Sequence, residues 1–304
     1  METCSSKERH NKGLTHILTK LFIIIFILLL IVTVITLIGI CTSKDLEVNY
    51  YTIEADTKAA LRIVQLTDLH NTEFGQNNLD LVQTVEAQQP DMIFMTGDMI
   101  NRDDENLDII CTLIEQLADI APIYFGYGNH ETSWEEYFGQ SMATRLTDAG
   151  AVVVQDSYVD IDVDGQPLRI GGCMNYYRKW GMMTSSQEQW NMEDAFADDF
   201  ENTDRYKILL NHIPTSWVDW DGINEYNVDL VFSGHYHGGM IRIPIIDRGV
   251  YAPYIGLFPK YTKGVVYGSK TICVQSAGLG TEHFIPRIYN PPEIVVVDLV
   301  PDTN

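Results

Sequence analysis

Residues 61–70 read LRIVQLTDLH, and this stretch decides the fold class of the chain. It begins as a β-rich apolar run and ends on side chains that are common metal ligands. The same arrangement recurs where apolar runs over 91–95, 122–125, 206–210 and 228–232 each precede a cluster containing Asp, Asn or His. Open α/β sheets present ligands beyond the carboxyl ends of their strands, so these clusters are predicted to follow five strands of an α/β fold.

The polar clusters contain five of the eight histidines of the chain. In chain order, the candidate ligands are Asp68, His70, Asp98, Asn129, His130, His212, His235 and His237. Residues two apart in an extended chain point to the same side, so Asp68 with His70, and His235 with His237, can each aim into one cavity. Carboxylate, amide and imidazole groups together suit manganese, iron or zinc better than calcium, which prefers oxygen ligands alone.

The segments between the clusters predict an α/β class. Residues 78–88 and 106–118 show helical spacing of Leu, Val and Ile between the first strands. From Ala151 onward the apolar runs become shorter, which suggests a second sheet packed on the first. The strands expected there are 152–154, 158–163, 168–170 and a final one over 293–299.

Residues 21–41 (LFIIIFILLLIVTVITLIGIC) contain no charged residue, and as a helix they would span roughly 30 Å, the thickness of a bilayer core. We interpret them as one transmembrane anchor between an N-terminal tail over 1–20 and a linker with a first strand over 42–59. A cleaved signal peptide is the alternative, although the apolar run exceeds the ~7–15 residues usual for one. Basic residues concentrate before the anchor, so the positive-inside rule places the N-terminus in the cytoplasm and the domain over 60–304 outside the cell membrane.

Composition argues against several classes of protein. The formal net charge is -22, which disfavours a nucleic-acid-binding surface. Three cysteines follow the anchor without paired spacing, so they are interpreted as small buried apolar residues: Cys111, Cys173 and Cys273. Residues 160–165 (DIDVDG) begin like a calcium loop, but Gly171 occupies the closing position of such a loop. The flanks alternate as strands, and a β-hairpin turned at the Asp-Gly pair is favoured.

Two segments, 173–205 and 238–264, interrupt the strand pattern with Trp, Met, Gly and other aromatic residues. They are expected to cover the site, either selecting substrate or without a ligand role. His283 is interpreted as a loop histidine outside the ligand set. The cations near the expected site loops are interpreted as exposed, solvated charges, with binding of an anionic head group as the alternative: Arg242, Lys260, Lys263 and Arg287.

In order and spacing, the five clusters resemble the motifs of the calcineurin-like metallophosphoesterases over about residues 60–300. Residues 233–239 (SGHYHGG) and 290–294 (NPPEI) are most similar to the membrane-associated bacterial branch of that family. Together with the strand pattern, the resemblance implies two packed mixed β-sheets flanked by helices. This is a four-layer αββα sandwich, here preceded by one transmembrane helix.

The resemblance also implies a two-metal site. One divalent ion would take Asp68, His70 and His237, the second would take Asn129, His212 and His235, and Asp98 would bridge them. His130 would be the acid near the leaving group, and Asp98 would share the catalytic role. The implied mechanism uses two cations about 3.5–4 Å apart to activate a bridging water, whose hydroxide attacks the phosphorus in line.

Two positions near the implied acid depart from the family pattern. Many members have a carboxylate where this chain has Asn101. An amide accepts a hydrogen bond but does not stabilise an imidazolium, so Asp103, Asp104 or Glu131 would tune His130, or His130 would be a weaker acid. Glu131 itself replaces a commoner Asp, which is a mild change.

The leading hypothesis from the sequence is a membrane-anchored, metal-dependent phosphoesterase. Its substrate would be a phosphate ester or pyrophosphate, with phospholipids and lipid-linked compounds among the candidates. Ala277 stands where the membrane-associated branch often has Arg, which removes an arginine-phosphate contact and leaves the substrate open. The alternative is a non-catalytic, metal-stabilised envelope binding module. Loss of ligands would support that alternative, but all seven ligand positions are present.

Overall fold

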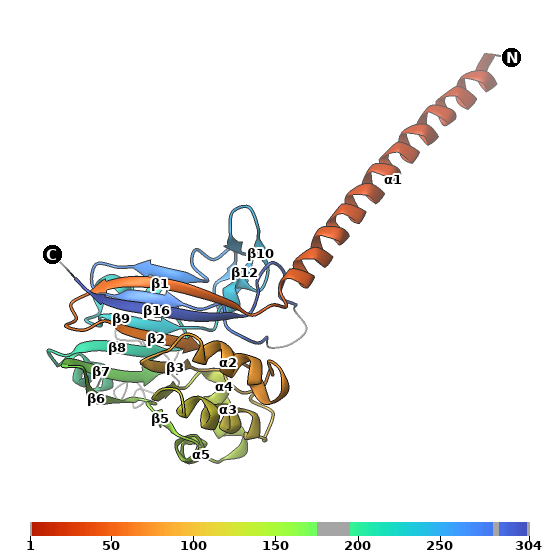
Figure 1. Ribbon diagram of the computed structural model, residues 1–304. Coiled ribbons are helices and arrows are strands. Elements are labelled where there is room, and N and C mark those ends of the chain that lie inside the picture. Colours follow the sequence, from red (N-terminus) through yellow and green to blue (C-terminus); the bar gives the residue numbers. More distant parts are fainter. Residues whose placement is uncertain (1, 175–194, 282–285, 303–304) are drawn as a thin grey trace.

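The structure is a computed structural model that describes residues 2–174, 195–281 and 286–302. Two six-stranded β-sheets lie face to face, and helices cover their outer faces (Figure 1). The predicted four-layer αββα sandwich is therefore confirmed. The aromatic residues Trp180 and Trp190 of the first interrupting segment, and His283, lie outside the described residues.

The first sheet has the strand order β1-β16-β2-β3-β4-β5. Strands β2 to β5 are parallel, and β16 runs antiparallel to β2 and parallel to β1. The strands are β1 Glu47–Ala55, β2 Leu61–Leu66, β3 Met92–Thr96, β4 Ile123–Gly126, β5 Ala151–Val153 and β16 Glu293–Pro301. The helices on the outer face are η1 Gln76–Asn78, α2 Leu79–Glu86, α3 Asp108–Ala118, α4 Asn129–Phe138 and α5 Ala143–Asp148.

The second sheet has the order β14-β15-β9-β8-β7-β6, with parallel pairing from β15 to β7. Its strands are β6 Ser157–Val163, β7 Gln166–Cys173, β8 Tyr206–Asn211, β9 Leu230–Ser233, β14 Gly264–Tyr267 and β15 Ile272–Gln275. Helices α7 Thr215–Val218 and α8 Gly222–Glu225 pack on its outer face. Between β9 and β14 lie η2 His237–Gly239, β10 Arg242–Ile243, β11 Arg248–Gly249, β12 Tyr251–Ala252 and β13 Gly256–Leu257.

An apolar core between the two sheets fixes their relative position. Phe94 of β3 meets Phe232 of β9 edge to face, with ring centroids 5.1 Å apart. Ile63 of β2 and Ile208 of β8 are fully buried in the same cluster. Because this core joins β2 and β3 to β8 and β9, the loops that follow these strands are held at one edge of the sandwich.

Two strands lie in a different sheet from the one predicted. Strand β5 extends the first sheet beside β4, and β16 lies in that sheet between β1 and β2. The apolar run over 294–297 is fully buried, as expected of a strand covered on both faces. Short apolar runs indicate strands, but pairing partners are set by distant segments, so the assignment of these two strands to the second sheet was wrong.

The hairpin predicted at the Asp-Gly pair is confirmed. Strands β6 and β7 are antiparallel, and Val163 pairs with Gln166 across a two-residue turn. Asp164 and Gly165 have φ angles of 52° and 81°, the left-handed pair that a type I′ hairpin requires. Cys173 in β7 and Cys273 in β15 are buried as expected, whereas Cys111, in α3, is only half-buried.

Helix α1 (Glu2–Thr42) projects away from the sandwich (Figure 1). Its segment over 16–42 is long and apolar enough to cross a membrane by length and composition. Within the described residues, the last turns of α1 contact the domain. The N–H of Tyr289 donates to the carbonyl of Gly39 (3.1 Å), and the Tyr289 hydroxyl donates to the carbonyl of Ile35 (3.0 Å). Ser43 Oγ accepts the N–H of Asn290 (2.8 Å). Residues 289–290 thus form the contact site of the domain for the end of α1, which we call the seat of the helix.

Candidate metal centre

Loops from both sheets meet at one edge of the sandwich. Asp68 and Asp98 follow β2 and β3 of the first sheet, whereas His212 and His235 follow β8 and β9 of the second. The N–H of His235 donates to both carboxylate oxygens of Asp68, at 3.0 and 3.2 Å. This contact joins the two sheets directly at the site.

The backbone of these loops is strained. Five candidate ligands have left-handed φ angles between 45° and 66°: Asp68, His70, Asp98, His235 and His237. A residue with a Cβ loses roughly 1–3 kcal/mol in such a conformation, which persists only where the surroundings impose it. The strain aims these side chains into a common space.

Asp68, His70 and His237 form the first group of candidate ligands. Their ligand atoms all lie within 4.8 Å of one another. His237 Nε2 is 3.4 Å from Asp68 Oδ1, and the His70 and His237 rings stack with centroids 5.1 Å apart. All three residues are buried, so this group could hold a metal ion away from bulk solvent.

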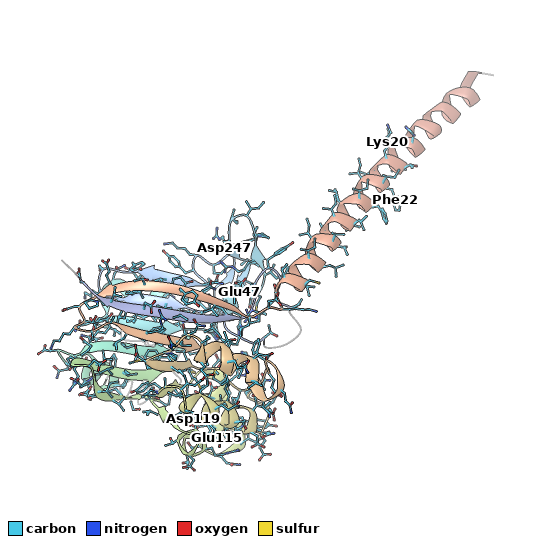
Figure 2. All side chains as sticks on the ribbon, in the orientation of Figure 1. Lys20, Phe22, Glu47, Glu115, Asp119 and Asp247 are labelled. Carbon is cyan, nitrogen blue, oxygen red and sulfur yellow. The ribbon has the colours of Figure 1, made fainter. Side chains whose placement is uncertain are left out.

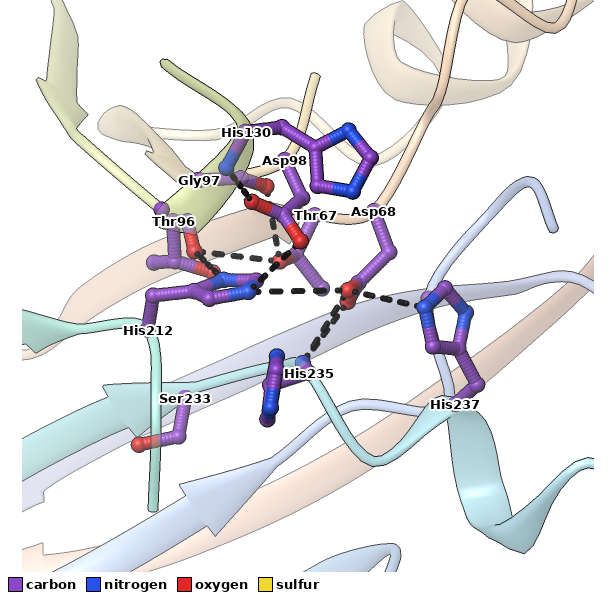
Figure 3. Close-up of polar contacts among 12 residues, drawn as sticks. Thr67, Asp68, Thr96, Gly97, Asp98, His130, His212, Ser233, His235 and His237 are labelled. Atoms are coloured by element: carbon purple, nitrogen blue, oxygen red, sulfur yellow. Dashed lines mark hydrogen bonds and ion pairs between the residues drawn. The ribbon is translucent and has the colours of Figure 1, made fainter. Parts of the chain in front are cut away.

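Asp98, His212 and His235 form the second group, whose ligand atoms also lie within 4.8 Å of one another. His212 Nε2 is 3.0 Å from Asp98 Oδ2 and 3.9 Å from Asp68 Oδ1, so it faces the carboxylates of both groups (Figure 3). On the other side of the ring, His212 Nδ1 lies 2.8 Å from the carbonyl of Thr96. A backbone carbonyl in this position fixes the ring and leaves Nε2 as the ligand atom.

Asn129, the remaining predicted ligand, is the first residue of α4. Its Oδ1 atom is buried and has no hydrogen-bond partner among the described residues. The next residue along the chain donates its N–H to Asp98 Oδ1 at 2.8 Å, so Asn129 begins its helix directly beside the second group. A buried carbonyl oxygen without a partner is costly, and a cation would satisfy it.

Residues 61–239 match the family model described as calcineurin-like phosphoesterase. The chain belongs to this family. The family expected from the motifs is therefore confirmed, and two His/Asp groups within one family domain indicate a dinuclear divalent metal site.

Individual relatives of this phosphoesterase are distant. It is 26% identical over 261 residues to the uncharacterized metallophosphoesterase YkoQ of Bacillus subtilis, covering 83% of this chain and 90% of that protein. It is 24% identical to the phosphodiesterase YaeI of Escherichia coli, covering 81% and 84% of the two chains. Among solved structures, a 5′-nucleotidase precursor from Thermus thermophilus aligns with a TM-score of 0.44 and 13% identity, over 80% of this chain and 54% of that one. A dimetal phosphatase from Danio rerio aligns with a TM-score of 0.42 and 10% identity, over 79% and 92%.

Burial and mutual charge shift the pKa values in the phosphoesterase site. Burial raises the pKa of Asp68 to about 6, although His212 opposes the shift. Burial disfavours charge on His212, but the carboxylates of Asp98 and Asp68 outweigh it and raise its pKa to about 9. Burial and the charge of His212 lower the pKa of His235 to about 3, and burial and His70 hold that of His237 well below its usual value. His235 and His237 are therefore neutral at pH 7, the form of imidazole that binds metals.

His130, the predicted acid, lies against the first group, with its ring edge to face on His70 at 4.6 Å between centroids. Its Nδ1 accepts the N–H of Arg102 (3.2 Å), which leaves the proton of the neutral ring on Nε2. Asn101 does not orient this ring, because its amide donates to the carbonyl of His70 instead (3.1 Å). The orienting group is a backbone N–H, which sequence reasoning missed because every residue type except proline supplies one.

Glu131 has a different role from the one considered from the sequence. Its buried carboxylate accepts the backbone N–H groups of Asp98, Met99 and Gly128, each at 2.8 Å. These bonds tie the loop after β3 to the start of α4. Glu131 therefore positions Asp98 rather than tuning His130. Asp104 is also engaged elsewhere, since its carboxylate accepts the Asn71 amide (2.8 Å).

The expectation of exposed, solvated cations was wrong for Arg287, Arg242 and Lys263, the last of which is largely buried and pairs with the buried Glu293 (3.2 Å). Arg287 is 6% exposed, and its Nη2 donates to the carbonyls of Ala277, Gly278 and Gly280 at 2.7, 3.0 and 2.6 Å. Burial lowers its pKa to about 10. Arg242 is 7% exposed and pairs with Asp247 (2.8 Å). Arg287 thus places a guanidinium beside Ala277, the position at which related proteins often have Arg. This guanidinium holds the loop over 277–280, which lies beside Asp68.

Two cavities lie beside the centre. The first, about 450 Å³, is lined by Asn101, Arg102, Asp103, His130, Ser133, Tyr137 and Thr281. The second, about 390 Å³, shares Thr281 with the first and reaches Ile40, Ser43 and Lys44 at the end of α1. Among the candidate site residues, His130 lines the wall of the first cavity, so this cavity opens on the side of the predicted acid.

Proposed function

We propose that this protein is a membrane-anchored, metal-dependent phosphoesterase. The observation that carries the proposal is the pair of buried ligand groups, which Asp68 and His212 connect at 3.9 Å. In the proposed arrangement, one divalent ion binds Asp68, His70 and His237, and a second binds Asn129, His212 and His235, with Asp98 between them. Oxygen and imidazole donors without a thiolate favour manganese, iron or zinc.

The residues present fit two cations on three counts. Asn129 Oδ1 is buried without a partner, the carboxylates are buried close to one another, and His212 is held by a backbone carbonyl with Nε2 facing inward. Two cations at this position would activate a water molecule for attack and neutralise the phosphate oxygens. Glu131 keeps Asp98 in place through the backbone on both sides of it.

His130 is the proposed acid for the leaving group. Its Nε2 carries the proton while Nδ1 is held by the N–H of Arg102. The cavity that His130 lines offers space for the leaving group. Proton donation by a positioned side chain contributes about 10²–10⁴-fold to rate, and a buried, oriented ring beside His70 suits that role.

The membrane placement rests on α1. Residues 21–41 are the proposed anchor, with 1–20 in the cytoplasm and the phosphoesterase domain over 60–304 outside the membrane. The charge distribution along the sequence and the outward exposure of the apolar side chains of α1 support this placement. Residues 42–59 then connect the anchor to the domain and supply β1, which pairs with β16.

The proposed substrate is a phosphate ester of a lipid or a lipid-linked compound. The supporting observation is that Thr281 lines both the cavity beside His130 and the second cavity, which reaches Lys44 and Ile40 at the end of the anchor. A lipid substrate whose head group lay in the second cavity would therefore lie next to the cavity that His130 lines. Lys44 and Arg287 line this cavity together with the single acid Glu73, so cations outnumber acids and would favour an anionic head group.

The test is hydrolysis of soluble esters by the full chain in detergent, after metal removal and after restoration with manganese. We expect turnover of an aryl phosphodiester or phosphomonoester only with metal, and about 10²–10⁴-fold less in His130→Gln, which keeps its bound metal. Ser133→Ala, on the wall of the same cavity, is the matched control. Two bound metals without turnover of either ester would favour the non-catalytic binding module.

A further inference from the structure

The segment between η2 and β14 exposes apolar side chains that nothing in the described structure covers. We call residues 240–258 the hairpin insertion. Within it, Ile245 is 96% exposed, Leu257 70% and Tyr254 64%, and Ile246, Tyr251 and Phe258 are also exposed. Outside α1, the other exposed large apolar residues of the described chain are scattered: Tyr50, Leu79, Tyr137, Val152 and Tyr267. Single exposed residues are normal, but six within fourteen positions require a reason.

The hairpin insertion lies next to the end of α1. Ile241 forms a β-bridge with Ile288, and the N–H of Arg242 donates to the carbonyl of Ile288 (2.9 Å). The following residue, Tyr289, binds Gly39 of α1. One short segment therefore holds the hairpin insertion and the helix together. Figures 1 and 2 show the hairpins and Asp247 on the side of the domain from which α1 leaves, with Glu115 of α3 on the opposite side.

The hairpin insertion presents its apolar tip on a firmly held backbone. The buried Arg242 donates Nη1 to the carbonyl of Gly238 (2.8 Å), and Nη2 to the carbonyl of Asp247 (2.6 Å). Its Nε also binds the Asp247 carboxylate (2.8 Å), which offsets the only acidic charge of the turn. The isoleucines at 245 and 246 thus point outward from a clamped turn.

We propose that the hairpin insertion enters the interface of the same membrane that α1 crosses, so that the metal centre is held at head-group level. The inference rests on the anchor role proposed above for α1. The surface of the protein is strongly acidic, with a net charge of -22, so burial of apolar side chains drives the contact rather than attraction to anionic lipid. The substrate class that follows is a phosphate ester in a lipid head group.

The hairpin insertion also reaches the centre itself. The ring of Tyr254 stacks on His235, a candidate ligand, with centroids 5.4 Å apart. The same loop therefore exposes apolar side chains to the membrane and covers one side of the second ligand group. The hairpin insertion would therefore determine both how Ile245 and Ile246 contact the membrane and where the metal centre lies relative to it.

The first experiment places a benzophenone amino acid at residue 245 of the full chain, in vesicles of phosphatidylcholine with or without phosphatidylglycerol. Lipid adducts after irradiation are measured by mass spectrometry. We expect several-fold more adduct at 245 than at 115 on α3, and the same yield in both lipid mixtures. An adduct yield at 245 no higher than at 115 in either mixture overturns the proposal. Adduct formation requires no turnover, so its failure is distinct from failure of the proposed enzymatic function.

A second measurement tests whether the two hairpins enter the membrane together. The photoreactive residue is placed at 257, and Ile245→Ser with Ile246→Ser are introduced in the first hairpin. We expect several-fold less adduct at 257, with aryl ester turnover unchanged because both isoleucine side chains are exposed and neither is a candidate ligand. Val152→Ser on β5 should leave the adduct at 257 as it was. An undiminished adduct at 257 in the double variant overturns joint docking.

Discussion

The metal centre and the hairpin insertion depart from the usual distribution of side chains in opposite ways. The centre buries charged and polar groups, among them Asp68, Asp98 and His212, at exposures of 2% or less. The hairpin insertion exposes isoleucine, leucine and phenylalanine. Neither arrangement favours folding, because desolvated charges and hydrated apolar groups both raise the free energy of the folded chain.

The metal centre and the hairpin insertion each require a different kind of ligand or surface. Buried acids and histidines close to one another require opposite charge, which metal ions supply. Exposed apolar side chains on a turn held by hydrogen bonds require an apolar surface, which the membrane proposed beside α1 would supply. Both regions are held by extensive hydrogen bonding to the backbone, through Glu131 in one and Arg242 in the other. The unfavourable groups are therefore fixed in place rather than left to rearrange.

Removal of the Asp98 carboxylate is expected to have the largest effect on the metal centre. In Asp98→Ala, the carboxylate between the two ligand groups is lost. We expect the transition state to lose several kcal/mol of stabilisation, which lowers turnover at least about a thousandfold. Bound metal, measured by elemental analysis, should fall with it. Asp119→Ala, at an exposed position directly after α3, is the control. Full metal content and turnover in Asp98→Ala would contradict the ligand assignment.

Replacement of Glu131 tests whether the backbone around the centre must be fixed. In Glu131→Gln, the amide NH2 group replaces one of the two oxygens that accept backbone N–H groups. This NH2 cannot accept a hydrogen bond, so the loop that holds Asp98 loses part of its support. We expect a loss of about 10–100-fold in metal affinity or turnover, as for other groups that orient metal ligands. Glu136→Gln, exposed on the same helix, should change neither. Equal behaviour of the two variants would show that Glu131 is not a positioning residue.

The polar half of this comparison could be predicted from the sequence, and the apolar half could not. Each candidate ligand follows an apolar strand within a few residues, so local patterning indicates both the strand and the polar group that ends it. The same patterning indicated the hairpin at Asp164 and the helices α2 and α3. Sheet membership of β5 and β16 could not be read in this way, because strand pairing depends on contacts between segments far apart in the chain.

The role of Arg287 and the exposure of the hairpin insertion could not be predicted from the sequence, for a related reason. Whether a charged side chain is buried depends on carbonyls supplied by residues 277–280, and whether Ile245 is exposed depends on what packs beside it. Neither is a property of the local sequence. Backbone groups that orient a side chain, such as the N–H of Arg102 at His130, have no sequence signal at all.

The buried guanidinium of Arg287 offers a sharper test of the loop beside Asp68. Lysine cannot reproduce a planar group that binds three carbonyls, so Arg287→Lys should destabilise the protein by about 1.5–3 kcal/mol, the size of a hydrogen-bonded charge. Urea unfolding of the full chain in detergent measures this. Arg248→Lys, an exposed residue that binds one carbonyl, should have a smaller effect. A larger loss in Arg248→Lys would reverse the assignment of Arg287 as the structural cation.

The smallest expected effect connects the two regions. Gly39 lies against Ile288 and Tyr289, and a Cβ at this position would lie 2.5 and 2.7 Å from their side chains. Gly39→Leu should therefore lift the end of α1 from its seat. Asn290, in that seat, donates its amide to the carbonyl of His237 (2.7 Å), so the displacement reaches a candidate ligand.

We expect aryl ester turnover in Gly39→Leu to fall by about 0.5–2 kcal/mol, or roughly two- to thirtyfold, the range for coupling between distant sites. Ile38→Leu, an exposed neighbour on α1, is the matched control and should be neutral. The soluble ester needs no membrane, so any loss of its turnover measures coupling from the end of α1 to the metal centre. If Gly39→Leu leaves this turnover unchanged while lowering lipid adducts at residue 245, α1 orients the domain on the membrane but does not influence the metal centre.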